Sequence, residues 1–455
     1  MLLAVVIFLL VIGSIVFHFA SPGLGLWFPD IATDWSTIDL TINVTFWVTG
    51  AVFILVNLFM AYCVYRFRHK PGHKAVYEPE NTQLEKWLTI VTAVGVAVML
   101  APGLIVWAQF VDVPEEAAEY EVLAQQWQWQ FRYPGDDGVM GVADVAFVSE
   151  TNPFGINPED PNGQDDVVVN NPEMHLPVDK PVKALLRSHD VLHNYTVPQF
   201  RVKMDLVPGL VSYLWFKPTK IGSYDILCEE LCGIGHFIMR GKVVVDTQAD
   251  YDTWLAQQPT FAETQAPNPV SITTGQALYA VCATCHGAAG EGMQALNGPK
   301  LSGQQAWYIE RQLRYFKDRV RGGEAGDTNG MMMASMVATL ADDQAIRDVA
   351  AYITTLPDTP APATVTGNIA NGRLIYQRNC AACHLDDASG TWYTDAPRLR
   401  GMSDWYFVSQ INSFSDGIRG RHPDDDYGEQ MVGMASAMAD QQEIEDVAAY
   451  INSLQ

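Results

Sequence analysis

Basic residues are scarce in this chain of 455 residues, which has 28 lysines and arginines against 52 aspartates and glutamates. The formal net charge of −24 argues against a protein that binds nucleic acid or an anionic membrane surface through a basic face. The acidity suits a partner with a basic docking face, although many exported bacterial proteins are acidic without one. The length is too great for one compact domain and predicts about two to four domains.

Cysteine is also scarce, and its distribution is informative. Six of the seven cysteines form three close pairs, and Cys63 lies alone in an apolar run, where we expect it only to pack against its neighbours. Close pairs in a compartment that permits disulfides are compatible with structural or redox bridges. A pair therefore counts as a cofactor site only if other ligand residues accompany it. The pairs are Cys228/Cys232, Cys282/Cys285 and Cys380/Cys383.

Long apolar runs are confined to the first 110 residues. Residues 42–65 and 88–108 are each long enough to cross about 30 Å of hydrocarbon. The positive-inside rule places the basic loop between them in the cytoplasm, so residues 40–112 form a transmembrane hairpin and the rest of the chain lies outside. The basic loop contains Arg66, Arg68, His69, Lys70, His73 and Lys74.

The first apolar run, residues 1–20, lacks the basic start of a secretory signal. His18 is also unsuited to the position that it would hold before a cleavage after Ala20. These features favour a retained span with its N-terminus inside, with a cleaved signal as the alternative.

Residues 118–250 alternate apolar and polar positions and contain many β-branched side chains, which predicts a β-sandwich or barrel. Residues 134–172, rich in Asn, Pro, Gly and Asp, are interpreted as a long surface insertion. The Pro-containing segment 258–271 is predicted to be a semi-rigid linker, long enough for the module that follows it to settle over the β domain.

The segments 272–357 and 367–455 repeat each other at an offset of 98 residues, with a second linker at 357–366. Each ends in a matched helical pattern, so both are predicted to be copies of one all-helical module. Each copy contains the pattern C-x-x-C-H. The matched residues are Cys282, Cys285 and His286 in the first copy and Cys380, Cys383 and His384 in the second.

This pattern suits a covalent c-type haem, because two thiols add across the haem vinyl groups and the histidine presents its imidazole to the iron. A thioredoxin-like redox pair would need a βαβ context, which is lacking here. The modules resemble the class I domains of bacterial dihaem cytochromes c. The resemblance implies a methionine as sixth iron ligand, namely Met333 and Met431, with Met336 and Met434 as the alternative pair.

A different cluster places two thiols, one imidazole and one thioether within twelve residues: Cys228, Cys232, His236 and Met239. Soft thiolates select copper or zinc, and a weak thioether ligand is typical of electron-transfer copper. A structural zinc site and a disulfide between the two cysteines are alternatives on spacing alone.

The pattern C-x-E-x-C-G-x-G-H-x-x-M, preceded by Asp190-Val191-Leu192-His193, resembles the CuA signature of cytochrome c oxidase subunit II. The resemblance covers about residues 40–247 and implies a cupredoxin-like β domain. The Glu230 side chain would also reach a magnesium ion shared with subunit I. The implied CuA ligands are the bridging thiolates of Cys228 and Cys232, the imidazoles of His193 and His236, the thioether of Met239 and the backbone carbonyl of Glu230.

Two further segments resemble the same family. In the segment Gln126-Trp127-Gln128-Trp129, the family's first tryptophan receives the electron, which assigns this role to Trp127 and leaves Trp129 to the core. The segment that ends in Glu85 resembles one whose glutamate stands at the mouth of a proton channel, although Trp87 is displaced by one residue from the family pattern. His189 lies outside the pattern and is interpreted as a surface residue or one behind the copper ligands.

These features predict the electron-input subunit of a haem–copper oxidase, built from a transmembrane hairpin, with an additional N-terminal span if residues 1–20 are retained, a cupredoxin-like domain and two class I cytochrome c domains. Electrons would pass from a donor through two haems c and CuA to subunit I, which would reduce oxygen to water with proton pumping. The catalytic site itself is expected on that other subunit.

Subunit I, subunit III and, as donor, cytochrome c or a quinol:cytochrome c reductase are the expected partners. The expected location is the bacterial inner membrane, with the soluble domains on its outer side. A CuA-bearing nitric oxide reductase and a membrane-anchored electron shuttle are the alternative functions.

Overall fold

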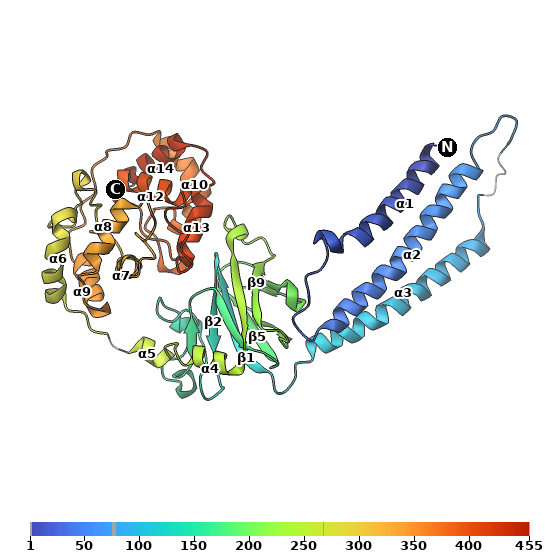
Figure 1. Cartoon of the computed structure of the whole chain (residues 1–455), viewed down its shortest axis with the longest axis horizontal. Coiled ribbons are helices and arrows are strands. Elements are labelled where there is room, and N and C mark those ends of the chain that lie inside the picture. The colour runs from blue at the N-terminus through green and yellow to red at the C-terminus, as the bar shows by residue number, and fades with distance from the viewer. Residues whose placement is uncertain (1, 75–78, 267, 455) are drawn as a thin grey trace.

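The computed structural model describes residues 2–74, 79–266 and 268–454; residues 1, 75–78, 267 and 455 and the side chain of Asp426 lie outside the described part. The predicted segments 1–20, 258–271 and 367–455 each include one undescribed residue. Along the chain, the described residues form a group of long helices, a β domain and two helical modules (Figure 1).

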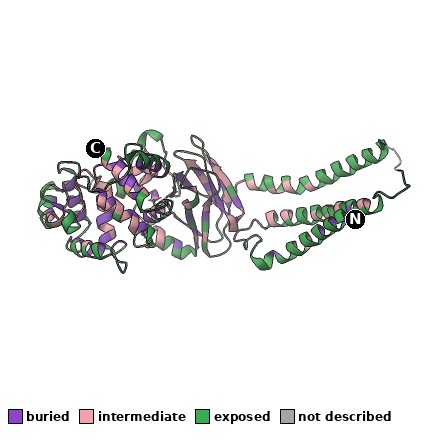
Figure 2. Ribbon diagram, turned by 90° about the horizontal axis from the view of Figure 1, so that it is seen from above, coloured by how far each residue is buried: buried purple, intermediate pink, exposed green. Residues whose placement is uncertain are grey.

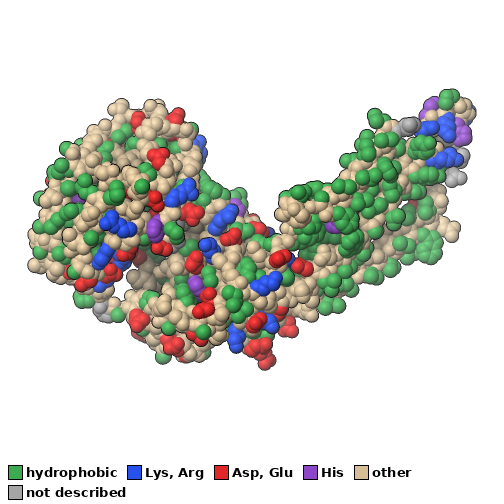
Figure 3. All heavy atoms as spheres, viewed as in Figure 1, with side chains coloured by type: hydrophobic (Ala, Val, Ile, Leu, Met, Phe, Trp, Pro, Cys, Tyr) green, Lys and Arg blue, Asp and Glu red, His purple; other side chains and the backbone are tan. Residues whose placement is uncertain are grey.

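Within the described residues, three helices are long and apolar enough to cross a membrane: α1 (Leu2–Ala20), α2 (Ser36–Arg66) and α3 (Thr82–Val111). They extend away from the β domain, and Figure 2 shows that most of their residues are exposed. Figure 3 shows that apolar side chains dominate this surface. Such a surface requires lipid or an apolar partner around it. The predicted spans lie inside α2 and α3, and the first apolar run forms α1.

The β domain contains two five-stranded sheets, with strand orders β3-β2-β1-β5-β8 and β4-β10-β9-β6-β7 among the described residues. Both sheets contribute to one core, in which Trp129, Tyr195 and Phe216 are fully buried. This arrangement is the predicted cupredoxin-like sandwich. The strands are β1 (Ala118–Gln125), β2 (Gln128–Tyr133), β3 (Val167–Val169), β4 (Glu173–Pro177), β5 (Val182–Ser188), β6 (His193–Val197), β7 (Val202–Leu206), β8 (Ser212–Phe216), β9 (Gly222–Cys228) and β10 (Arg240–Asp246).

The insertion 134–172 is more than the surface loop that its composition predicts. Its β3 pairs with β2, and Phe154 and Ile156 are fully buried in a small core of their own. Asp166, also fully buried, forms an ion pair with Arg132. The polar composition of this segment concealed the few apolar and charged side chains that anchor it.

The predicted linker 258–271 is also partly docked. It contains α5 (Phe261–Gln265), which begins with a capping box between Thr260 and Glu263. Phe261 is buried in the small core of the insertion, and its backbone N–H donates to the Asp166 carbonyl at 2.6 Å. Because Phe261 is buried, the part of the predicted linker that can act as a tether is shorter than residues 258–271. The helix before it, α4 (Gln248–Leu255), packs on the β domain through Tyr251.

The two helical modules share one plan. In each, a glycine lets the first helix cross closely over the last: an added Cβ would lie 2.0 Å from the Asp348 carbonyl oxygen at Gly275 and 1.9 Å from that of Asp446 at Gly372. The first module contains α6 (Ile272–His286), α7 (Ala306–Lys317), α8 (Thr328–Val337) and α9 (Asp343–Thr354). The second contains α10 (Ile369–Asn379), α11 (Ala381–His384), α12 (Asp404–Ser415), α13 (Asp426–Ala435) and α14 (Gln441–Ser453).

Short 3₁₀ helices complete the described secondary structure: η1 (Pro22–Leu24), η2 (Val145–Phe147), η3 (Pro161–Gly163), η4 (Pro198–Phe200), η5 (His236–Ile238), η6 (Gln294–Leu296) and η7 (Trp392–Thr394). The second linker, 357–366, packs against both modules: Asp358 forms ion pairs with Lys300 and Arg398, each at 2.6 Å. The modules therefore form one continuous body (Figure 1).

Candidate metal centres

The candidate copper ligands lie at one end of a sheet, where β9 leads into the loop formed by residues 228–239, here called the copper loop. Cys228 ends β9, and His193 begins the neighbouring strand β6. The Cys228 and Cys232 sulfurs are 3.7 Å apart, far beyond the ~2.05 Å of a disulfide. Both cysteines are free thiols, so the disulfide alternative does not hold in this structure.

Each thiol has its own imidazole. The Nδ1 atom of His193 is 3.9 Å from the Cys228 sulfur, and that of His236 is 3.5 Å from the Cys232 sulfur. The atoms that His193 and the two thiols offer all lie within 4.8 Å of one another. Two central sulfurs, each with a nitrogen beside it, suit a pair of soft metal ions that share the thiolates.

Two weaker donors complete the cluster. The Met239 thioether is 3.8 Å from the Cys232 sulfur, and the Glu230 carbonyl oxygen is 3.3 Å from the Cys228 sulfur. A tetrahedral zinc ion uses four donors, which two thiolates and two imidazoles already supply. The thioether and the carbonyl therefore favour copper over zinc at this site.

Asp190 orients His193. Its carboxylate lies 2.9 Å from His193 Nε2 and accepts a hydrogen bond from the Gln126 backbone N–H at 2.7 Å. Burial acts to lower the pKa of His193, but Asp190 and Cys228 outweigh it, and the net pKa is raised. With Nε2 held by the carboxylate, Nδ1 faces the thiols. In the sequence, Asp190 was only part of a motif; its contact with His193 reveals what it does.

The two thiols influence each other's ionisation. The hydrogen bond between the two sulfurs lowers the pKa of the Cys228 thiol to about 3 and raises the pKa of the Cys232 thiol. One thiolate therefore disfavours a second beside it. Bound cations remove this conflict, because they stabilise both groups as thiolates.

Trp127 packs directly on the copper loop. Its indole N–H donates to the Cys232 carbonyl at 3.1 Å. An added Cβ would lie 2.4 Å from the indole ring at Gly235 and 2.9 Å from it at Gly233. Both glycines of C-G-x-G-H are therefore needed for this close approach.

The C-x-x-C-H residues of both modules line one large cavity, which continues between the modules. His286 Nδ1 is 2.7 Å from the Pro299 carbonyl oxygen, and His384 Nδ1 is 2.8 Å from that of Pro397. Burial lowers the pKa of both imidazoles, that of His384 to about 4, although the carbonyls oppose the shift. Each ring is thus held neutral with Nε2 available to a metal, as a haem ligand requires.

Both methionine pairs reach the cavity. Met333, Met336, Met431 and Met434 all line it, so the contacts do not choose between the two predicted pairs. Met333 and Met431 also pack against the cores of their own modules.

Among the described residues, the second module makes the hydrogen bonds to the copper domain, defined here as residues 118–250. Gln430 donates to the Trp127 carbonyl at 3.3 Å, and Gln125 donates to the Tyr393 carbonyl at 2.6 Å. Trp127 is only 3% exposed, so it lies buried beneath this contact. The expectation that the first module settles over the copper domain is wrong, because the linker's α5 is docked and the second module carries the contact residues.

Comparisons with known proteins agree with this geometry. Residues 120–247 match the family described as cytochrome C oxidase subunit II, periplasmic domain, and residues 272–357 and 369–455 each match cytochrome c. An alternative cytochrome c oxidase subunit 2 from Bradyrhizobium diazoefficiens is 56% identical over 270 residues, which are 59% of this chain and 96% of that protein. The chain belongs to the cytochrome c oxidase subunit II family.

Three further proteins are less similar to this subunit II. A cytochrome c oxidase subunit 2 from Cereibacter sphaeroides is 30% identical over 225 residues, covering 46% of this chain and 72% of that one. Two solved structures share 26% identity: the periplasmic domain of subunit II of the Bradyrhizobium japonicum oxidase, at a TM-score of 0.24, and cytochrome c4 from Pseudomonas stutzeri, at 0.34. They cover 32% and 41% of this chain and 95% and 100% of their own.

Membership implies copper in the CuA domain of this subunit II and haem c in its cytochrome c domains. It also implies a subunit I partner. Three apolar helices and a periplasmic family domain describe a membrane-anchored protein with its soluble domains in the periplasm.

The remaining predicted residues are placed as follows. His189 is half-buried, donates from Nε2 to the Pro153 carbonyl at 2.8 Å and packs edge-on against Tyr393 of the second module. Glu85 is exposed in the first turn of α3, which the Asn81 side chain caps. Glu230 is half-buried on the copper loop.

Proposed function

We propose that this subunit accepts electrons from an external donor at its first module, passes them through its second module to CuA, and delivers them to subunit I, which reduces oxygen to water with proton pumping. The three helices would span the bacterial inner membrane, and subunit III would complete the complex. The bound haem and copper groups supply reversible one-electron transfer with little rearrangement.

Each module would hold one haem c. The first would use Cys282, Cys285, His286 and Met333, with Met336 as alternative; the second would use Cys380, Cys383, His384 and Met431, with Met434 as alternative. The CuA ligands would be Cys228, Cys232, His193, His236, Met239 and the Glu230 carbonyl.

The observation that carries the order of transfer is the contact between the second module and the copper loop. Cys383 packs against the core of the copper domain, and Trp127 and Ile238 line the same cavity as the second C-x-x-C-H. Trp127 also bonds to the Cys232 carbonyl. Trp127 therefore lies between the second module and Cys232, a proposed copper ligand to which it is joined by one hydrogen bond. This position supports Trp127 as the residue that receives the electron.

The first module supplies the face for the donor. At the repeat offset of 98, Met332 and Met336 occupy the positions of Gln430 and Met434. Met332 is 55% and Met336 39% exposed, whereas Met434 in the docked second module is only 8% exposed. An exposed apolar rim around the proposed redox cavity suits a transient contact with a donor such as cytochrome c or a quinol:cytochrome c reductase.

Two carboxylates would serve the junction with subunit I. The Glu230 side chain, adjacent to the copper ligands, would reach a magnesium ion at that junction. Glu85, at the cytoplasmic start of α3, would stand at the mouth of a proton channel, a role that its exposure permits.

The substitution Cys232→Ser tests the copper assignment. It should abolish the near-infrared absorption of CuA and stop oxygen consumption, because a bridging thiolate is lost, while the c-haem absorption stays at the parent value. Cys63→Ser, which removes a thiol on α2, is the matched control and should change neither the CuA absorption nor oxygen consumption. If Cys232→Ser keeps two coppers and parent turnover, the ligand assignment is wrong.

A further inference from the structure

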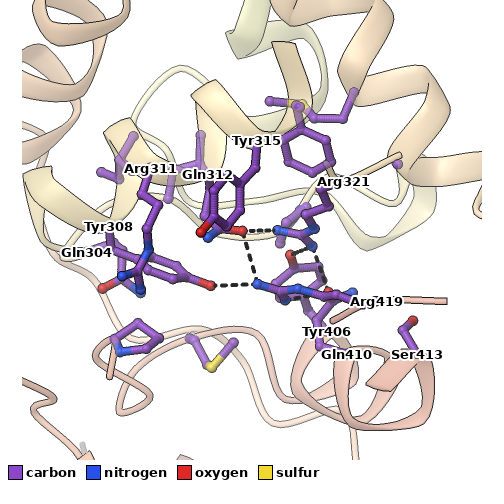
Figure 4. Close-up of a pocket in the computed structure, with 18 of the residues that line it drawn as sticks. Gln304, Tyr308, Arg311, Gln312, Tyr315, Arg321, Tyr406, Gln410, Ser413 and Arg419 are labelled. Carbon is purple, nitrogen blue, oxygen red and sulfur yellow. Dashed lines mark hydrogen bonds between the residues drawn. The ribbon is translucent and has the colours of Figure 1, made fainter. Parts of the chain in front are cut away.

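Where the two modules meet, six side chains related by the repeat form one cluster (Figure 4). All six line the cavity that holds the C-x-x-C-H residues. The first module provides Tyr308, Gln312 and Arg321, and the second provides their equivalents Tyr406, Gln410 and Arg419. We call them the arginine cluster.

The hydrogen bonds of the arginine cluster cross between the modules. Arg321 donates to Gln312 of its own module at 2.7 Å. Its other terminal nitrogen donates to the Tyr406 hydroxyl at 2.7 Å and to the Gln410 side-chain oxygen at 2.6 Å, both in the second module.

Arg419 repeats this pattern in the opposite direction. It donates to Gln410 of its own module at 2.8 Å, to the Tyr308 hydroxyl at 3.2 Å and to Gln312 at 3.0 Å. Each guanidinium also lies 4.5 Å from the ring centroid of a phenylalanine, Phe316 for Arg321 and Phe414 for Arg419. The two arginines therefore share both glutamines and act as one unit.

The two positive charges of the arginine cluster are not balanced by negative charges on the side chains bonded to it. Among the described side chains, neither Arg321 nor Arg419 forms an ion pair, and their side-chain partners are neutral oxygens. Two other arginines at the same junction are paired: Arg311 with Asp395 at 3.0 Å and Arg398 with Asp358 at 2.6 Å. Asp425 attracts Arg419 only from a longer range and already accepts from the Gly428 N–H at 3.0 Å.

The effect of this charge appears at Tyr308. Burial acts to raise the pKa of this phenol, but Arg419 and Arg321 outweigh the effect, and the net pKa is lowered. Arg321 itself is only 8% exposed, and the buried Nε of Arg419 has no described hydrogen-bond partner. Burying a cation without an anion is costly, so the site calls for anionic groups from the cavity that it lines.

We infer that Arg321 and Arg419 form one shared clamp for the propionate carboxylates of both haems and thereby couple the potentials of the two modules. The inference rests on the proposed function, which places one haem c in each module. Guanidinium groups bind carboxylates through paired hydrogen bonds, and each bond adds charge compensation. Because each arginine is bonded to both modules, the loss of one arginine should change the midpoint potentials of both haems.

The test is a redox titration of the two c haems in the purified complex that carries Arg321→Gln. Loss of the positive charge should lower the midpoint potentials of both haems, because a haem next to uncompensated carboxylates is more easily oxidised. The potentials should also become more dependent on pH, since the carboxylates lose a partner that keeps their pKa low. Arg321→Lys retains the charge and should restore most of both potentials.

Arg398→Gln is the matched control, because Arg398 also bridges the modules, donating to the Gly303 carbonyl at 2.8 Å, but is paired with a carboxylate. It should leave both potentials at the parent value. A shift of only one haem in Arg321→Gln, or of neither, would overturn the shared clamp.

If Arg321→Gln fails to retain haem, Tyr406→Phe removes only the hydroxyl that positions Arg321 and should lower both potentials by a smaller amount. Unmoved potentials in that variant would count against the clamp. The haem content of the parent complex separates the two hypotheses: fewer than two c haems would contradict the proposed function, whereas two haems with unmoved potentials would contradict the clamp alone.

Discussion

The two helical modules are copies in sequence, yet they have different surroundings. The face around the second C-x-x-C-H lies on the copper domain, and the equivalent face of the first module is open. The covered copy has Gln430 and Asn379 where the open copy has Met332 and Val281, which are 55% and 48% exposed. A permanent contact can use directed hydrogen bonds, whereas an exposed apolar rim suits partners that arrive and leave.

Under the proposed function, duplication would divide one role between two copies in this way. The candidate cofactor ligands recur in both copies, and the bonds of His286 and His384 to the Pro299 and Pro397 carbonyls match. The two copies differ at many positions, and those that bear on docking include the rim pairs Met332/Gln430 and Val281/Asn379. The predictions below change those side chains in one copy and use the other copy, or a neighbouring residue, as the control.

The largest effect is expected from Gly433→Leu. A Cβ on Gly433 would already lie 3.0 Å from Ile238 of the copper loop, so a leucine must push the second module away. Overpacking of this kind costs ~1–3 kcal/mol, which corresponds to a roughly 5- to 150-fold weaker docking. Reduction of CuA by the haem modules, followed by stopped-flow spectroscopy, should slow while haem reduction by the external donor is unchanged.

The control for this prediction is Ser335→Leu, at the equivalent position of the first module, where Ser335 is exposed. It should leave CuA reduction at the parent rate. Equal CuA reduction in Gly433→Leu and the parent would show that the docked contact is not the route to copper.

A smaller effect is expected at the open face. Met332→Glu places a charge on the apolar rim and should raise the KM for the donor about tenfold, the equivalent of ~1.4 kcal/mol of lost contact. The rate of CuA reduction from already reduced haems should not change. Met331→Glu, at a neighbour that is 39% exposed and does not line the cavity, should leave KM unaltered. The donor does not use this face if both variants behave alike.

The smallest effect concerns Asp358, which joins the modules through Lys300 and Arg398. Burial acts to raise the pKa of Asp358, but both cations outweigh it and the net pKa is lowered. The stabilisation is therefore present above the ordinary aspartate pKa of ~3.9 and is lost as pH falls through the lowered value. Because the side chain is 36% exposed, its contribution is at most about 1 kcal/mol.

Asp358→Asn should accordingly reduce the free energy of unfolding of the modules by up to about 1 kcal/mol at pH 7. Denaturant unfolding followed by haem absorption measures this quantity. The free energies of unfolding of parent and variant should become equal at acid pH. A constant difference between them at every pH would refute the ion-pair explanation.

Much of the architecture was predictable from local pattern. The apolar runs predicted α2 and α3, alternation predicted the β-sandwich, and the offset of 98 predicted two equivalent modules. The identity of the candidate ligands was also local, because thiols, imidazoles and thioethers at fixed spacing follow from the chemistry of haem and copper. The structure brings Cys228, Cys232 and His193 together as that chemistry requires.

Contacts between distant segments were not predictable. Phe261 packs the predicted linker against the insertion. Asp190 orients His193 through Nε2, the ring nitrogen that faces away from the Cys228 thiol. Gln430 of the second module contacts Trp127 and helps to bury it. None of these contacts has a periodic signal in the sequence. Sequence by itself determined which residues can hold the cofactors, since ligand chemistry is a property of residue type and short spacing. Only the tertiary structure decided which module faces copper, because that choice depends on shape and packing between surfaces more than a hundred residues apart in the chain.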